Sequence, residues 1–347
     1  MKTYLYRLHF KGPVHFGSTG IGLENTQECL SSDSLTSALI NAFSILGMAD
    51  EVIRALKEER PAFVLSSLFP FGFPSAPSED ASETIYALPR PLVKPPVKDN
   101  KIFRSLGKDL KRQKYLDPND FFAWIGDVPL DFEEVKAILD RSRRLARPWD
   151  REKGEGWWTT ELRPRVALDR ENQNSNIWFC GTLHFHMYAG LYGLIRIIDD
   201  KWKEDLAGAF KLLGELGLGG ERTYGMGTFD FSGFEPLNGV LLRGLQKDSP
   251  RFVLLSNYYP TDDERSNLGE KFEAWDFIEN RGYVVSGRMA TTLKRKRIRM
   301  IVEGSVVKQP VKGTMVDVTP DDADSLGLEH RVYRSGRAFL MPEGGAV

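Results

Sequence analysis

The order of strand-like and helix-like segments constrains the fold of this chain more than any other feature. Residues 4–10 alternate in polarity, as an antiparallel strand with one solvated face does. The stretch "SSDSLTSALINAFSILG" then places apolar residues at helical spacing, with Ser32 or Asp33 as the expected N-cap. A short helix over 50–59 and a strand over 62–69 complete a strand–helix–strand half-domain.

A second half-domain follows later in the chain. The stretch "ELRPRVALDRENQNSNIWFCGTLHFHMY" holds two alternating runs around a polar turn, which is typical of a long β-hairpin. A helix is expected after the acidic pair at 199–200, and a strand over 228–234. The segment 176–234 therefore completes a βαββαβ unit, the order of a ferredoxin-like or RRM-type domain.

The rest of the chain divides into an insertion and a second copy of this pattern. "PFGFPSAPSEDASE" and "LPRPLVKPPVKDN" predict loops, while "DFEEVKAILDRSRRLA" predicts one helix. After residue 240 there are four strand candidates, with a helix start at "TPDDADS" before the last. We predict an α+β protein with two ferredoxin-like domains: 1–239, with an insertion at about 75–175, and a degenerate copy over 240–347.

Composition limits the kinds of ligand and compartment. The 347 residues are 41% hydrophobic, with a formal net charge of −1, so any contact with nucleic acid must come from local basic patches. Cys29 and Cys180 have no metal-ligand spacing and are expected to be free thiols in a reducing compartment. No apolar run approaches membrane-spanning length, which predicts a cytoplasmic protein without a membrane contact.

The stretch "GLGGERTYGMG", residues 217–227, is the most distinctive local motif. It has the glycine spacing of a phosphate-binding P-loop, but it follows a predicted helix, and Met226 stands where the lysine should be. Its glycines can adopt positive φ and admit another backbone, while Arg222 offers a cation for phosphate and Tyr224 a ring for stacking. These properties suit a single RNA strand. The alternative is a glycine-terminated helix followed by a tight turn.

A basic run, "LKRKRIRM", is the second candidate surface. In strand geometry Lys294 and Lys296 face opposite to Arg295 and Arg297, and one face would be cationic throughout. We expect this run to contact RNA or a partner protein, although such runs are often only solvated.

Catalytic and metal-binding interpretations of the histidines are weaker. His15, in "VHFGS", could act as a general acid or base, but no partner residue stands at a recognisable spacing, so packing or an RNA contact is favoured. His184 and His186 would point the same way on a strand, yet no carboxylate or cysteine completes a metal site. Asp33 reads as a helix cap, with Ser31 and Ser34 as possible phosphate donors. No metal or cofactor is expected.

Several motifs together resemble a known family. "HFGSTGIGLE", "SSDSLTSAL", "GLGGERTYGMGTF", "EGSVV", "MVDVTP" and "VYRSGRAFLMP" are similar to the fourth Csm subunit of type III-A CRISPR effector complexes, a RAMP-superfamily protein. The likeness extends from about residue 4 to residue 341. Residues 75–160 match only loosely, and their extra basic and proline-rich segments are expected to be lineage-specific surface.

The resemblance implies a function and a set of partners. It implies two ferredoxin-like (RAMP) domains without nuclease activity, which hold the repeat-derived 5′ handle of the CRISPR RNA. The partners would be the large polymerase-like Csm subunit and the first backbone RAMP subunit, with target RNA nearby. Related backbone subunits cut target RNA with an aspartate, but Asp33 is already explained here as a cap. A metal-independent endoribonuclease using His15 and a purely structural docking module are the two alternatives.

The resemblance also implies roles for individual residues. The long hairpin would act as a thumb that separates handle from guide, with Trp157 and Trp158 exposed before it and Arg163 along it. The RNA contacts expected from all of these motifs are His15, Phe16, Gly17, Ser18, Ser31, Ser34, Arg165, Arg170, Gly219, Gly220, Arg222, Tyr224, Gly225, Lys294, Arg295, Lys296 and Arg297.

Overall fold

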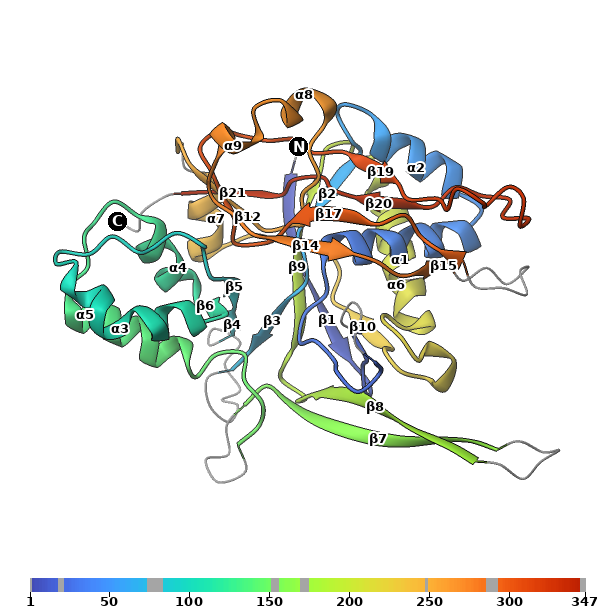
Figure 1. Cartoon of the computed structure of the whole chain (residues 1–347), viewed down its shortest axis with the longest axis horizontal. Coiled ribbons are helices and arrows are strands. Elements are labelled where there is room, and N and C mark those ends of the chain that lie inside the picture. Colours follow the sequence, from blue (N-terminus) through green and yellow to red (C-terminus); the bar gives the residue numbers. More distant parts are fainter. Residues whose placement is uncertain are drawn as a thin grey trace.

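The computed structural model describes residues 2–17, 22–73, 84–150, 156–168, 175–246, 249–284 and 293–343. Helices and antiparallel strands alternate through these ranges, so the predicted mixed α+β class is confirmed (Figure 1). The assignment of both halves as ferredoxin-like, and the division at residue 240, stay predictions.

The N-terminal half is built on one antiparallel sheet with β1 (Lys2–Phe10) near its centre. One edge of β1 pairs with β9 (Gly190–Ile197), in a register that runs from Lys2↔Ile197 to Leu8↔Leu191. Its other edge pairs with β10 (Phe229–Phe231) and β11 (Glu235–Pro236). Beyond β9 lie β2 (Phe63–Leu65), β3 (Phe69–Gly72) and β4 (Ile85–Tyr86), giving the order β10-β1-β9-β3-β4.

The strand predicted over 62–69 is interrupted. Ser66 N–H donates to the carbonyl of Leu194, but Ser67 N–H donates to the carbonyl of Leu255, in the C-terminal half. Because the Ser67 N–H bonds to the C-terminal half instead of to β9, the predicted strand is divided into β2 and β3. The same hydrogen bond connects the two halves of the chain.

Three helices accompany this sheet in the predicted β-α-β-β-α-β chain order. They are α1 (Ser32–Ile45), α2 (Ala49–Lys57) and α6 (Trp202–Leu216). The α6 ring Phe210 lies 4.7 Å from the β1 ring Tyr6, and Phe43 of α1 lies 6.0 Å from Trp202, centroid to centroid. Aromatic packing therefore holds α6 to the sheet and to α1.

The insertion is more ordered than the sequence predicted. It contains β5 (Leu88–Pro89), α3 (Lys101–Arg112), β6 (Tyr115–Leu116), α4 (Pro118–Ile125) and α5 (Phe132–Ser142). Only α5 was predicted, although Asp117 before Pro118 is a recognisable helix start. Phe121 and Trp124 of α4 are buried in the main core cluster, so this helix of the insertion is part of the core.

The long hairpin is confirmed. β7 (Trp158–Leu168) pairs with β8 (Ser175–Phe185) along its whole length, and it projects from the body away from the insertion (Figure 1). The expected exposure of Trp157 and Trp158 is wrong, since only 1% and 4% of their surfaces are exposed. Local polarity misled the prediction, because the Trp157 indole reaches the carbonyl of Phe73, 2.8 Å away, inside the core.

The C-terminal half contains one four-stranded sheet and several short ribbons. The sheet has the order β13-β18-β12-β21. Its strands are β12 (Phe252–Leu254), β13 (Phe272–Ala274), β18 (Val306–Val307) and β21 (Leu340–Pro342). The ribbons are β14 (Phe277–Asn280) with β17 (Ile298–Ile301), β15 (Tyr283–Val284) with β16 (Leu293–Lys294), and β19 (Met315–Asp317) with β20 (Tyr333–Ser335). Short helices α7 (Gly239–Leu245), α8 (Asp262–Arg265) and α9 (Leu268–Lys271) accompany them.

Two predictions for this half are wrong. The "TPDDADS" segment forms turns instead of a helix. The basic run is not one strand, because Arg295 N–H donates to Gly282 and Lys296 N–H donates to Val318, which separates β16 from β17. The continuous cationic face therefore does not form.

Asp33 joins the two halves and does not cap α1. The N-cap is Ser31, whose side chain makes no capping hydrogen bond. The Asp33 carboxylate is fully buried and accepts hydrogen bonds from the Asn257 amide at 3.2 Å, the Asn280 amide at 3.0 Å and the Arg334 guanidinium at 2.9 Å. All three donors belong to the C-terminal half, so the predicted helix cap is instead an ionic link between distant segments.

Arg337, two residues after β20, also links the two halves. Its guanidinium is buried and donates to the carbonyls of Leu56 and Glu58 at the end of α2, and to the carbonyl of Gly313. A cation suits the unpaired carbonyls and the negative end of the dipole at a helix C-terminus. The C-terminal half thus fixes the start of α1 and the end of α2.

We predict that Asp33→Asn lowers the free energy of unfolding by about 3–5 kcal/mol, because it leaves the Arg334 charge buried without its counter-ion. The substitution also turns an amide NH₂ toward donors only. Urea unfolding measures the effect, and Asp50→Asn, at an exposed position of α2, is the matched control with a change below about 0.5 kcal/mol. Equal stability of the two variants would contradict the ionic link.

Candidate nucleic-acid interface

The glycine loop after α6 packs against its own chain. Gly217, Gly219, Gly225 and Gly227 all have positive φ. A Cβ on Gly219 would lie 2.5 Å from the carbonyl oxygen of His15, and the Gly220 N–H donates to that same oxygen at 2.8 Å. The backbone that the glycines admit closely is therefore the segment around His15.

His15 connects this loop to the hairpin. Its imidazole is 4% exposed, and its Nδ1 lies 2.7 Å from the carbonyl oxygen of Gly181 in β8. Phe16 is 2% exposed, and both its N–H and its carbonyl bond within the chain, to Thr26 and Gln27. His15 and Phe16 thus position the loop and the hairpin, and their rings do not face solvent.

The exposed end of the glycine loop presents a ring and cations. A short 3-10 turn (Arg222–Tyr224) leaves Tyr224 64% exposed. The guanidinium of Arg165, from β7, lies 4.3 Å above the Tyr224 ring and 4.0 Å from Glu221, while Arg222 is exposed. The hairpin and the loop are distant in sequence, and the structure brings these candidate residues together.

A groove of about 760 Å³ is lined by residues from both halves of the protein. Five candidates from the sequence line it: Phe16, Gly17, Ser31, Ser34 and Arg295. Sequence reasoning missed six basic residues that also line it: Arg90, Lys111, Arg112, Lys114, Arg281 and Arg334. Their sequence positions lie in the insertion and the C-terminal half.

The groove carries an excess of positive charge. Its acidic lining residues are Glu28, which pairs with Lys114 at 2.6 Å, and Glu303, which is half-buried and accepts a hydrogen bond from the Ser67 hydroxyl. Burial raises the pKa of Glu303 and so disfavours its charge. Burial, together with the charge of Arg334, lowers the pKa of Arg295 to about 10, which still leaves it protonated at neutral pH.

α3 supplies the freest cations of the groove. Within the described ranges, no ion pair involves Lys111 or Arg112, and Arg112 is exposed. Unpaired cations at a groove wall can exchange their counter-ions for RNA phosphates.

The other sequence candidates lie apart from the groove. Lys296 pairs with Asp321 at 2.7 Å, and Lys294 and Arg297 are exposed. Ser18 and Arg170 lie outside the described residues. The two thiols, Cys29 and Cys180, are free, and burial raises the pKa of Cys29 to about 12.

The prediction that His184 and His186 point the same way on one strand is wrong, because β8 ends at Phe185. His184 in β8 lies 3.4 Å from Glu161, whereas His186 follows the end of β8 and stacks on Trp149, 4.0 Å away. In the described part of the chain, no group of three or more potential metal ligands is assembled.

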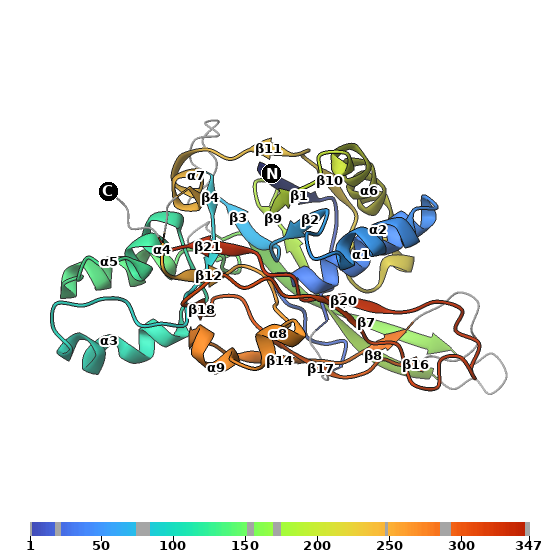
Figure 2. The same cartoon turned by 90° about the horizontal axis from the view of Figure 1, so that it is seen from above.

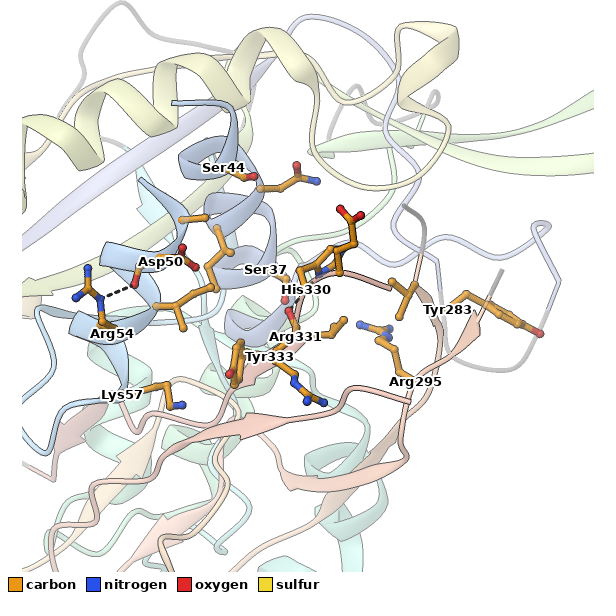
Figure 3. A pocket seen from close by; sticks show the side chains of 17 residues that line it. Ser37, Ser44, Asp50, Arg54, Lys57, Tyr283, Arg295, His330, Arg331 and Tyr333 are labelled. Atoms are coloured by element: carbon orange, nitrogen blue, oxygen red, sulfur yellow. Dashed lines mark hydrogen bonds between the residues drawn. The ribbon is translucent and has the colours of Figure 1, made fainter. Parts of the chain in front are cut away.

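A second cavity of about 930 Å³ opens on the far side of Arg295, between α1, α2 and residues 329–333. Figure 3 shows Arg295 directed into it, with Lys57 and Tyr333 opposite. Arg295 lines both spaces, but no residue of the glycine loop or of the 15–17 segment lines this one.

Comparisons with known proteins place this architecture. The family model "CRISPR Csm4 C-terminal domain" matches residues 247–342. Curated proteins named "CRISPR system Cms protein Csm4" are similar along the chain. The one from Thermococcus onnurineus is 28% identical and covers 90% of this chain and 92% of its own length. The one from Methanocaldococcus jannaschii is 22% identical, at 99% and 97%.

The chain is similar to Csm4 proteins over its length, and its C-terminal part matches the Csm4 family model. Solved Csm4 structures share its fold. A Csm3–Csm4 subcomplex of the type III-A CRISPR–Cas interference complex aligns with a TM-score of 0.61 at 19% identity, covering 99% of both chains. A Csm1–Csm4 cassette in complex with pppApA aligns with a TM-score of 0.56 at 22% identity, also covering 99% of both.

In the described ranges of the chain, no helix is both long and apolar enough to cross a membrane.

We predict a graded response to alanine in and near the glycine loop. Gly219→Ala should destabilise most, because a positive φ of 101° adds to the close contact with His15. Gly225→Ala, at φ 78° in open space, should cost about 1–2 kcal/mol from the backbone alone. Gly208→Ala, on an exposed turn of α6, should stabilise by about 0.5–1 kcal/mol. Thermal unfolding ranks the three, and a Gly219→Ala protein as stable as the Gly208 variant would rule out the loop packing.

Proposed function

We propose that this protein is a non-catalytic RNA-binding and scaffolding subunit of a type III-A (Csm) CRISPR interference complex, in which it holds the 5′ repeat-derived handle of the CRISPR RNA. The observation that carries this proposal is the basic groove built from both halves beside the glycine loop. Specific RNA recognition favours unpaired strands whose phosphates meet cations and whose bases stack on rings.

The groove and the loop divide the work of binding. Lys111, Arg112 and Arg295 would meet phosphates, while Ser31 and Ser34 offer hydroxyls on the groove wall. Tyr224, with Arg222 and Arg165, would stack on a base at the entrance, and Gly17 and Gly225 keep the backbone open there. Gly219, Gly220, His15 and Phe16 would act indirectly, by holding the loop. Lys294, Lys296 and Arg297 would add a weaker cationic fringe beside Arg295.

The scaffolding part of the proposal rests on the structural relatives. Csm4 chains of the same fold were solved with Csm3 and with Csm1. We infer that this chain likewise links a backbone subunit to the large polymerase-like subunit, in the cytoplasm and with target RNA nearby. The projecting hairpin, predicted as a thumb, is a suitable contact toward the backbone subunit.

The non-catalytic part rests on the environment of the two candidate residues. The His15 imidazole is buried and committed to Gly181, and the Asp33 carboxylate is buried and saturated by three donors. A general base must reach the proton that it removes, and neither group reaches solvent. Incubating the full chain with repeat RNA in EDTA should leave the RNA intact, whereas one discrete product would favour the endoribonuclease alternative.

We predict that Arg222→Ala with Tyr224→Ala weakens binding of a labelled handle RNA tenfold or more, because a stacked base contributes about 1–3 kcal/mol. Lys111→Gln with Arg112→Gln should lower the log–log salt slope by about 1.4, at 0.7 per lost phosphate contact. Filter binding from low to high salt measures both.

Lys211→Gln with Arg243→Gln is the matched control, since both residues are exposed and lie outside the groove lining. Its affinity and slope should equal those of the unaltered protein. If the groove variant behaves like this control while partner subunits still bind, the protein is a docking module and the RNA assignment is wrong.

A further inference from the structure

An exposed aromatic pair lies on the outer face of the β14–β17 ribbon. Trp275 and Phe277 are 51% and 48% exposed, with ring centroids 6.3 Å apart and planes inclined by 34°. All seven tryptophans lie in the described ranges, and Trp275 is the only exposed one. Large rings that stay half in solvent side by side are unusual on a protein surface and indicate a binding site.

Arginines surround this pair. The guanidinium of Arg299 lies 5.3 Å above the Phe277 ring, and both Arg299 and Arg297 are exposed. Two carboxylates lie near the pair. Glu279 pairs with Arg281 and lies 4.0 Å from Arg299, and the exposed Asp276 accepts a hydrogen bond from the Phe277 N–H at 2.8 Å. The three arginines Arg281, Arg297 and Arg299 against the two carboxylates leave one positive charge in excess, in a protein whose overall formal charge is −1.

A chain of contacts connects the pair to the basic groove. Arg281 lines the groove and forms an ion pair with Glu279. The Glu279 carboxylate in turn lies 4.0 Å from the guanidinium of Arg299. Arg299 covers Phe277, which lies beside Trp275. Figure 2 shows β14 and β17 along the side of the molecule opposite to α6, with no helix drawn over their outer face. Ile278 and Asn280 of β14 line the groove, so Phe277, which alternates with them, lies on the other face of the ribbon. A ligand that passes around the end of β14 at Arg281 would meet the two rings.

We propose that Trp275, Phe277 and Arg299 form a stacking platform for unpaired RNA, which continues the proposed RNA groove beyond the handle. Bases of any sequence can stack on such rings, while neighbouring guanidiniums meet the phosphates. A protein partner would also use exposed aromatic residues, but the excess of arginine and the continuity with the groove favour a polyanion. The proposal rests on the proposed function of the groove.

The experiment compares two labelled RNAs on the full chain: the handle alone, and the handle extended by fifteen uridines. Trp275→Ala with Phe277→Ala should weaken binding of the extended RNA tenfold or more and leave the handle unchanged. Phe132→Ala, at an exposed ring of α5, is the control and should change neither affinity. Trp275→Phe should retain the affinity for the extended RNA while abolishing the quenching of tryptophan fluorescence that the uridines cause.

The outcomes separate this inference from the groove assignment. If the extended RNA binds no tighter than the handle, or the double alanine variant binds it normally, the platform is disproved while the groove stands. If that variant instead loses a copurifying Csm subunit at unchanged RNA affinity, the surface is a protein interface and the inference is overturned. If the groove variants also leave handle binding intact, the proposed RNA-binding function is contradicted, and the platform inference, which rests on it, is contradicted as well.

Discussion

The buried ion pair between Asp33 and Arg334 is the interaction on which the architecture depends. It joins the first turn of α1 to β20, and the amides of Asn257 and Asn280 complete the carboxylate's hydrogen bonds. Removing one partner of such a pair costs far more than the pair itself contributes, because the other charge stays buried. Around it, the main core cluster runs through both halves of the chain and includes Val253 and Phe339. The halves therefore share one interior, and the ion pair fixes their relative position.

The candidate interface is a consequence of that junction. The groove has walls from α1, from α3 and from β14, and it exists only when the C-terminal half is docked. His15 makes a second connection, because its ring bonds to Gly181 of the hairpin and its carbonyl accepts a hydrogen bond from Gly220 of the glycine loop. These contacts hold the hairpin against the loop and so place Arg165 over Tyr224. Stability and the proposed RNA recognition are thus linked, because the same contacts that close the core also assemble the cations of the groove.

Local patterns predicted local structure, and long-range contacts account for the failures. Alternation and turn chemistry sufficed for β1 and for the β7–β8 hairpin, since both depend on neighbouring residues. Asp33 looked like a helix cap because its partners lie 224 to 301 residues away. Trp157 looked exposed because its neighbours are polar, although its contacts are in the core. The basic run looked like one strand because nothing in its sequence reveals that Arg295 and Lys296 bond different segments. The groove's cations from the insertion were missed for the same reason: only the fold brings them to Ser31 and Arg295.

The proposed RNA site is a groove built by both halves of the chain. Photo-crosslinking of a handle RNA carrying 4-thiouridine, followed by peptide mapping, tests it most directly. We expect crosslinks in peptides from at least two walls of the groove. One wall is the α3 segment with Lys111 and Arg112, and the other is β14 with the following Arg281. The loop with Tyr224 should also be crosslinked. Crosslinks confined to the outer surface of α6, or to a single half of the chain, would contradict it.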